Sequence, residues 1–167
     1  VFGSAQTHRR LTAHICKLCD LDGISVNYRL APEHPFPAAI DDALTAYKTA
    51  LDAGVQNIIL AGDSAGGGLA LTLLGRILAE GLEKPAALVA FSPWTDMTMS
   101  GGSMASNDET EDLLPQNQIE NARNYYVPDD AHNPLASPIF ADFTGAPPCL
   151  IQVGSGEVLL DDARRIS

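Results

Sequence analysis

Ser64 is the residue whose surroundings most clearly indicate chemistry. It stands in Gly62-Asp63-Ser64-Ala65-Gly66, which fits the pattern G-x-S-x-G. In this pattern the serine occupies a strained turn between a strand and a helix, which exposes its hydroxyl for attack on a carbonyl carbon. We expect Gly62 and Gly66 to be glycines because side chains two residues from the serine would collide with the neighbouring backbone. The backbone N–H of Ala65, at the start of the helix, is a candidate donor to an oxyanion.

A serine of this kind works with an acid and a histidine, which follow it in that order along the chain. The acid belongs just beyond the C-terminal end of a strand, where it can orient an imidazole. Glu157 lies four residues after the apolar run that ends at Val153, and it is our candidate. Asp96, after the preceding apolar run, is the alternative. Asp161 and Asp162 fall inside the next helical pattern, so we expect them to act at the helix start or in support of the site.

The base is not found among these residues. The sequence has four histidines, and none of them follows Glu157. His8 and His14 belong to the first helical pattern, His34 to a proline-rich turn, and His132 to an Asp- and Asn-rich loop ahead of the acid. We expect all four to be structural or exposed.

Neither a nucleotide site nor a metal site is indicated. A dinucleotide fingerprint beginning at Gly66 would need a glycine where Leu71 stands, and the lysine of a P-loop is absent. Cys16-Lys17-Leu18-Cys19 is a CxxC pair on a helical pattern, with no second pair to close a zinc site. We expect these cysteines to be buried or half-buried, and we expect no metal and no cofactor.

The elements that would position Ser64 and Glu157 are visible in the hydrophobic pattern. Continuous apolar runs predict strands at 24–28, 58–61, 86–91 and 149–153. Apolar residues at helical spacing predict helices at 7–19, 38–53, 65–80, about 116–126 and from 158 onward. Such alternation predicts an α/β fold, a three-layer αβα sandwich with a mostly parallel sheet covered on both faces.

Composition restricts the partners. The 167 residues suffice for one domain, 46% of them are apolar, and the net charge is −11. A chain this acidic, without a cluster of basic residues, is not expected to bind nucleic acid or an anionic membrane surface. It also has no apolar stretch of about 18 residues that would cross a membrane.

Several longer motifs resemble one known family, and together they cover essentially the whole chain. They are Tyr28-Arg29-Leu30-Ala31-Pro32-Glu33-His34-Pro35-Phe36-Pro37-Ala38-Ala39 with Asp41-Asp42, Gly62 to Gly67, Ser92-Pro93-Trp94-Thr95-Asp96, Asn133 to Pro138, and Pro147 to Asp162. The chain resembles the hormone-sensitive-lipase-like esterases, the bacterial "family IV", which have the α/β-hydrolase fold. This resemblance implies a serine carboxylesterase that hydrolyses small short-acyl esters through an acyl-enzyme intermediate, without a cofactor. The family usually has Asp as the acid, and some members resemble this sequence in having Glu.

The resemblance also implies supporting roles. We expect Arg29, Glu33 and Asp63 to hold the loops around the elbow through charge-assisted hydrogen bonds. Trp94 is expected in the core. Five further apolar or aromatic residues could line an acyl pocket, although an apolar stripe under a cap is the interpretation we favour; they are Met97, Met99, Met104, Tyr125 and Tyr126.

Parts of the family pattern are missing from residues 1–167. Family members carry a cap, early strands and a His-Gly-Gly-Gly segment before a stretch like Val1-Phe2-Gly3-Ser4, and a catalytic histidine beyond the acid. We therefore expect a partial α/β-hydrolase domain that is inactive by itself, from a cytoplasmic protein able to form homo-oligomers. Plant gibberellin receptors resemble this family but lack the catalytic histidine, so the alternative is a non-catalytic small-molecule-binding protein.

Overall fold

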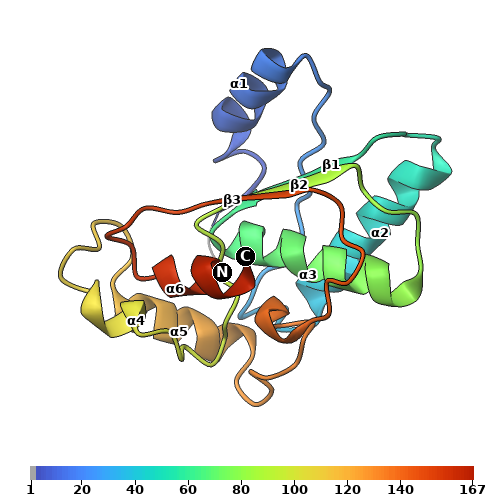
Figure 1. Cartoon of the computed structure of the whole chain (residues 1–167). Helices are drawn as coiled ribbons and strands as arrows, with labels where there is room; N and C mark the ends of the chain where they lie inside the picture. Colours follow the sequence, from blue (N-terminus) through green and yellow to red (C-terminus); the bar gives the residue numbers. More distant parts are fainter. Residues whose placement is uncertain (1–2) are drawn as a thin grey trace.

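A three-stranded parallel sheet lies at the centre of the computed structural model, which describes residues 3–167 (Figure 1). Its strands are β1 (Ile59–Asp63), β2 (Ala87–Phe91) and β3 (Cys149–Gln152), in the order β1-β2-β3. Ile59 is in register with Ala87, and Leu88 with Cys149. Because all three strands run the same way, the loops that follow them lie along one edge of the sheet. Ser64, Asp96 and Glu157 belong to these three loops.

One face of the sheet is covered by packed helices. The helices α2 (Ala38–Asp52), α3 (Ala65–Glu80) and α6 (Leu160–Ile166) lie on this side in Figure 1. Leu74 and Ile77 of α3 are fully buried, and Ile40 of α2 packs in the same cluster as Ile77. Ile166 of α6 packs with the cluster that contains Leu88. The predicted parallel sheet and the helices that follow its strands are confirmed.

The opposite face is only partly covered. Leu60 and Ile151 pack with the helices on the covered face, so their neighbours Ile59 and Leu150 face the other side, where they are 43% and 58% exposed. The helix α1 (Arg9–Cys19) lies on this side of the sheet in Figure 1, and none of its residues is buried. The predicted three-layer arrangement is therefore confirmed, with the α1 face less completely covered among residues 3–167. Cys19, on α1, is exposed, contrary to expectation, and within residues 3–167 no residue of this helix is buried.

The predicted strand at 24–28 is absent. This segment has no regular secondary structure and no strand partner within the described residues, and Ile24 is 75% exposed. Its apolar composition suits a strand, but a strand also requires a neighbouring backbone that completes its hydrogen bonds. Among the described residues, β1 pairs only with β2.

A second core lies beyond the edge where the strands end. It contains Trp94, Met97, Met104, Ile119 and Val158. It joins the loop after β2 to the predicted helix α5 (Gln116–Tyr126) and to the segment before α6. The sequence did not indicate α4 (Ser103–Ser106) or the 3-10 turn η1 (Pro138–Phe140), which are too short to give a periodic pattern. No helix in the described part of the chain is both long enough and apolar enough to cross a membrane.

Candidate active site

Ser64 occupies a strained backbone position between β1 and α3. Its φ is 51° and its ψ is −120°, a combination that non-glycine residues rarely adopt. Three backbone hydrogen bonds hold it there. The Ser64 N–H donates to the Phe91 carbonyl at 2.9 Å, and the Ser64 carbonyl accepts from the N–H groups of Trp94 and Gly68, each at 3.0 Å. The turn is therefore fixed by the end of β2 as well as by its own helix.

The glycines around Ser64 are needed at positions that differ in part from those expected. A Cβ at Gly62 would overlap the backbone of Gly66, as predicted. A Cβ at Gly66 would meet only the Tyr28 hydroxyl, at 4.0 Å, so the prediction for Gly66 was wrong for the described residues. The crowded position is Gly68, where a Cβ would overlap the carbonyl of Trp94. The additional glycines after G-x-S-x-G were the only signal of this contact in the sequence.

Ala65 begins α3, so its N–H is among the first-turn amides that have no acceptor within the helix. Beside it is a small cavity of about 50 Å³, whose lining includes Tyr28, Trp94 and Tyr126. Burial raises the pKa of both tyrosines, and the charge of Asp63 adds to the increase at Tyr28. Both phenols therefore stay neutral at physiological pH. Ala65 thus has the position expected of an oxyanion donor, a role that stays a prediction.

Glu157 lies in the loop after β3, along the same edge of the sheet as Ser64. Its Oε1 atom accepts a hydrogen bond from the Gly154 N–H at 2.7 Å. Its Oε2 atom has no hydrogen-bond partner among the described residues. A carboxylate held by one oxygen, with the other unpaired, could orient an imidazole. Its assignment as the acid stays a prediction.

Asp96, the alternative acid, is fully buried and already bound. Its Oδ2 atom accepts from the Ser100 hydroxyl at 2.6 Å and from Arg165 Nη1 at 2.8 Å, and its Oδ1 atom accepts from the Thr98 N–H at 2.8 Å and from the Thr98 hydroxyl. Burial alone would raise the pKa of Asp96, but hydrogen bonds from Ser100, Thr98 and Arg165 outweigh it and the pKa is lowered. Since both oxygens are occupied, this geometry favours Glu157 as the acid.

Asp162 ties α6 to the loop after β2. It is fully buried, and its Oδ2 atom accepts from the N–H groups of Thr95 at 2.7 Å and Asp96 at 2.9 Å. Its Oδ1 atom has no partner among the described residues. Burial raises the pKa of Asp162 to about 6. Asp161 also lies in the first turn of α6, where both carboxylates were expected.

The histidines and supporting charges lie mostly as predicted. His8 Nε2 lies 3.2 Å from Asp63 Oδ2, and the His132 ring stacks on Phe140. Arg29 pairs with Asp42 at the start of α2, with a closest distance of 2.7 Å. His14 and His34 are exposed, as expected. Glu33 is exposed as well and has no hydrogen bond or ion pair among the described residues, contrary to the supporting role expected of it.

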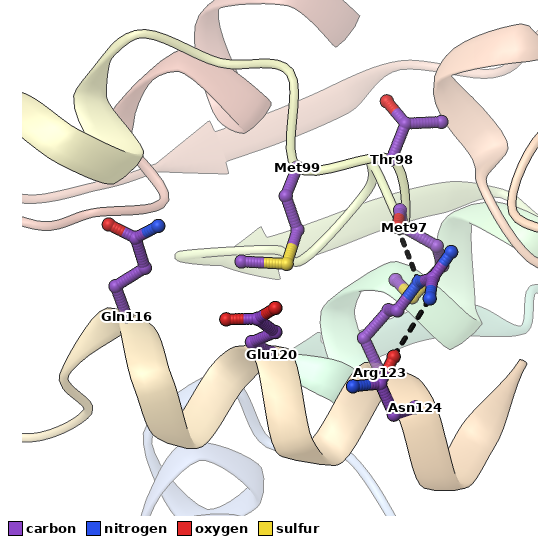
Figure 2. Close-up of a pocket in the computed structure, with 7 residues that line it drawn as sticks. All are labelled: Met97, Thr98, Met99, Gln116, Glu120, Arg123 and Asn124. Atoms are coloured by element: carbon purple, nitrogen blue, oxygen red, sulfur yellow. Dashed lines mark hydrogen bonds between the residues drawn. The ribbon is translucent and has the colours of Figure 1, made fainter. Parts of the chain in front are cut away.

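A larger pocket of about 260 Å³ lies between α5 and the loop after β2 (Figure 2). Met97 and Met99 line its loop side, and Met99 reaches toward the helix. Arg123 Nε donates to the Met97 carbonyl at 3.2 Å, and its Nη1 donates to Asn124 Oδ1 at 2.8 Å. The helix side is therefore polar; it comprises Gln116, Glu120, Arg123 and Asn124.

The residues considered for an acyl pocket are thus divided among different surroundings. Met104 is core, Tyr125 is 55% exposed, and Trp94 is buried as expected. The described residues contain no group of three His, Cys, Asp or Glu side chains placed to hold a metal ion.

A serine on a positive-φ turn between a parallel strand and a helix, with Glu157 in the loop after another strand of the same sheet, is the arrangement typical of an α/β hydrolase. The sequence matches the α/β hydrolase fold family over residues 1–167, so the chain belongs to that family.

Known relatives give a narrower placement. An acetyl-hydrolase of Streptomyces hygroscopicus is 43% identical, with 98% of this chain and 56% of the relative covered. An esterase of Acinetobacter venetianus is 39% identical, with 98% and 55% covered. The crystal structure of an esterase from the bacterial hormone-sensitive lipase family has a TM-score of 0.96 at 41% identity, with 99% of this chain and 57% of that one covered. The chain therefore groups with the hormone-sensitive-lipase-like esterases, and it spans little more than half the length of these relatives.

Proposed function

We propose that the full-length protein is a serine carboxylesterase that hydrolyses small short-acyl esters. The observation that carries this proposal is the strained turn of Ser64 at the start of α3, fixed by hydrogen bonds from two elements. Strain of this kind costs stability and is characteristic of functional sites. The similarity to esterases over 98% of the chain supports the same reaction class.

In the proposed reaction the Ser64 hydroxyl attacks the ester carbonyl carbon and a histidine takes its proton. The carbonyl oxygen becomes an oxyanion that accepts a hydrogen bond from the Ala65 N–H. The intermediate then expels the alcohol, which receives the proton from the histidine. Water attacks the resulting acyl-enzyme by the same route, releasing the carboxylic acid and restoring Ser64. Glu157 orients the histidine and stabilises its charged form.

The short-acyl preference is part of the proposal. One similar structure is that of a protein, EstE5, soaked with p-nitrophenyl butyrate; it has a TM-score of 0.95 and 42% identity to this chain, with 99% of this chain and 57% of that one covered. That ester has a four-carbon acyl group and releases a coloured alcohol, so it is a suitable first substrate.

Ser64→Ala and Glu157→Gln in the full-length protein test the assignment. We expect Ser64→Ala to lower kcat by at least about 10⁴-fold, because it removes the nucleophile. We expect Glu157→Gln to lower kcat by about 10⁴-fold, because an amide cannot stabilise the imidazolium. Hydrolysis of p-nitrophenyl butyrate is measured, and the exposed residues Ser25 and Glu83 supply matched Ser→Ala and Glu→Gln controls. Wild-type turnover in Ser64→Ala would refute the proposal.

The alternative is a protein that binds a small molecule without hydrolysing it. No histidine lies between Glu157 and Ser167, but the proposed base belongs further along the chain, so residues 1–167 favour neither function. If the full-length protein also has none there, p-nitrophenyl butyrate should bind without release of the coloured alcohol. Release that depends on Ser64 would exclude this alternative.

A further inference from the structure

The loop that carries Glu157 is held by several hydrogen bonds from residues 107–111. Outside that segment, the Ser103 hydroxyl donates to the Val158 carbonyl at 2.7 Å. The amide of Asn107 makes two of these bonds, with Nδ2 donating to the Ser155 carbonyl at 3.1 Å and to the Glu157 carbonyl at 2.9 Å. The Ser106 hydroxyl donates to Asn107 Oδ1 at 3.1 Å, so the oxygen and the nitrogen of the amide have different partners. One side chain thus spans two carbonyl groups of the turn.

Two further side chains of the segment bind the remaining residues of the turn. The Thr110 hydroxyl lies 2.9 Å from the Gly156 carbonyl and 3.0 Å from the Asn107 carbonyl, so its one proton is shared between the two acceptors. Glu111 Oε2 accepts from the Val158 N–H at 3.1 Å, while its Oε1 accepts from the Leu113 N–H at 3.0 Å. Every residue from 155 to 158 therefore has a backbone group bound by one of these three side chains. We call Asn107, Thr110 and Glu111 together the clamp.

The position of the Glu157 carboxylate depends on the backbone that the clamp holds. The carboxylate folds back onto the Gly154 N–H at 2.7 Å, so its direction is set by the turn and not by an outside partner. The turn belongs neither to β3 nor to α6, and its own backbone hydrogen bonds are long, with Glu157 N–H to Gly154 carbonyl at 3.3 Å. A shift of about 1 Å in a catalytic group can cost about 100-fold in rate.

We propose that Asn107 is a positioning residue for Glu157, acting through the Ser155 and Glu157 carbonyls, with Thr110 and Glu111 in support. This inference rests on the proposed function, in which Glu157 is the acid. Without the clamp the turn keeps its sequence but loses the hydrogen bonds that fix the carboxylate against the imidazole. The reaction then slows at the chemical step, while ester binding is little changed.

Asn107→Asp in the full-length protein is the most direct test. The aspartate has the same shape, but it places an oxygen where Nδ2 now faces two carbonyl oxygens. We expect kcat for p-nitrophenyl butyrate to fall about 10- to 100-fold with KM changed less than about threefold. We also expect the acid limb of the pH profile of kcat/KM to move to lower pH, because a displaced carboxylate no longer favours the protonated imidazole.

Three comparisons separate positioning from general destabilisation. Asn133→Ala removes an asparagine that also bonds across a loop, to Asp130 and to the Leu135 N–H, and it should leave the pH limb in place. Thr110→Val should lower kcat and Thr110→Ser should restore it, which keeps the test available if Asn107→Asp does not fold. In a Glu157→Gln background, Asn107→Asp should have little further effect on kcat.

The outcomes distinguish the two levels of the proposal. The positioning role alone would be overturned if Ser64→Ala and Glu157→Gln were inactive while Asn107→Asp and Thr110→Val both kept the wild-type kcat and the wild-type acid limb of the pH profile. An active Ser64→Ala protein would instead overturn the proposed function. The positioning role would also be overturned if Asn107→Asp lowered kcat without shifting the acid limb of the pH profile. The same holds if Asn107→Asp lowered kcat as much in the Glu157→Gln background as in the wild type.

Discussion

At the scale of single residues, the arrangement around Ser64 depends on which backbone each Cβ would meet. The motif specifies spacing along the chain. It marks Gly62 because the backbone that a Cβ there would overlap, that of Gly66, belongs to the same motif. The need for glycine at Gly68 comes from Trp94, in the loop after β2. Contacts between distant segments of this kind determine the cost of a side chain at each position.

Gly68→Ala and Gly66→Ala are therefore expected to have opposite effects. The new methyl group at Gly68 overlaps the Trp94 carbonyl, so the free energy of unfolding should fall by about 1–3 kcal/mol. At Gly66 the methyl group meets no backbone, and alanine is the better helix former by up to about 1 kcal/mol. Urea denaturation of both variants measures the difference. Equal destabilisation would contradict the geometry at one of the two positions.

The residue scale also shows the limit of prediction from sequence. Ser64, Ala65 and Glu157 could be proposed as site residues because a motif or a strand end marks each of them, and their roles stay predictions. The partners of Asp96 were not, because Arg165 lies on a distant helix and only folding brings it to the carboxylate. Asn107 carried no signal at all, since an asparagine between two short helical segments is ordinarily a turn residue.

At the scale of elements, α6 is joined to the loop after β2 through buried carboxylates. Asp162 accepts two backbone N–H groups of that loop, and Arg165, one turn further along the helix, reaches Asp96 at 2.8 Å. The same helix begins just after the turn of Glu157. Its attachment therefore helps determine where the edge of the sheet places the proposed acid.

Asp162→Asn should change how stability depends on pH. Burial raises the pKa of Asp162 from 3.8 to about 6, so the fold favours the neutral acid. The resulting stabilisation is complete below pH 3.8 and is lost as the pH rises through about 6, because the buried group must then ionise. The two pKa values differ by about 2, which corresponds to about 3 kcal/mol. Asn does not ionise. The free energy of unfolding of the Asp162→Asn variant, relative to that of the wild type, should therefore increase by about 3 kcal/mol between pH 4 and pH 8.

Chemical denaturation at the two pH values measures this difference. Thr72→Val is a suitable control because Thr72 is also buried, with its hydroxyl bonded to the Gly68 carbonyl, and carries no titratable group. Its effect on the free energy of unfolding should be the same at both pH values. A constant difference between Asp162→Asn and the wild type would show that Asp162 does not titrate in this range.

At the scale of the whole molecule, local sequence patterns predicted the parallel strands and the helices that follow them. The features that these patterns predicted wrongly depend on packing between distant segments. The periodicity of residues 65–80 and 116–126 is a property of the segment alone, and α3 and α5 match it. Whether residues 24–28 form a strand depends on a partner backbone, and whether α1 is buried depends on what packs over it. Neither property is encoded in the segment's own composition.

A polypeptide of residues 1–167 alone should be inactive as an esterase. It contains Ser64 and Glu157 but no histidine after the acid, so nothing in the required position can take the serine proton. We expect its kcat/KM for p-nitrophenyl butyrate to be at least about 10⁴-fold below that of the full-length protein, if the latter is the proposed esterase. Near-equal activity of the two would contradict this expectation. The Ser64→Ala variant of the same polypeptide measures the background rate.

The positive φ of Ser64 has an evolutionary consequence. A left-handed backbone position costs a serine about 1–3 kcal/mol, and a glycine would adopt it without strain. The residue that would serve folding best at position 64 therefore has no hydroxyl and could not act as a nucleophile. A chain selected for stability alone would drift away from serine here. A serine at this strained position is what selection for the proposed chemistry, at the expense of stability, would produce.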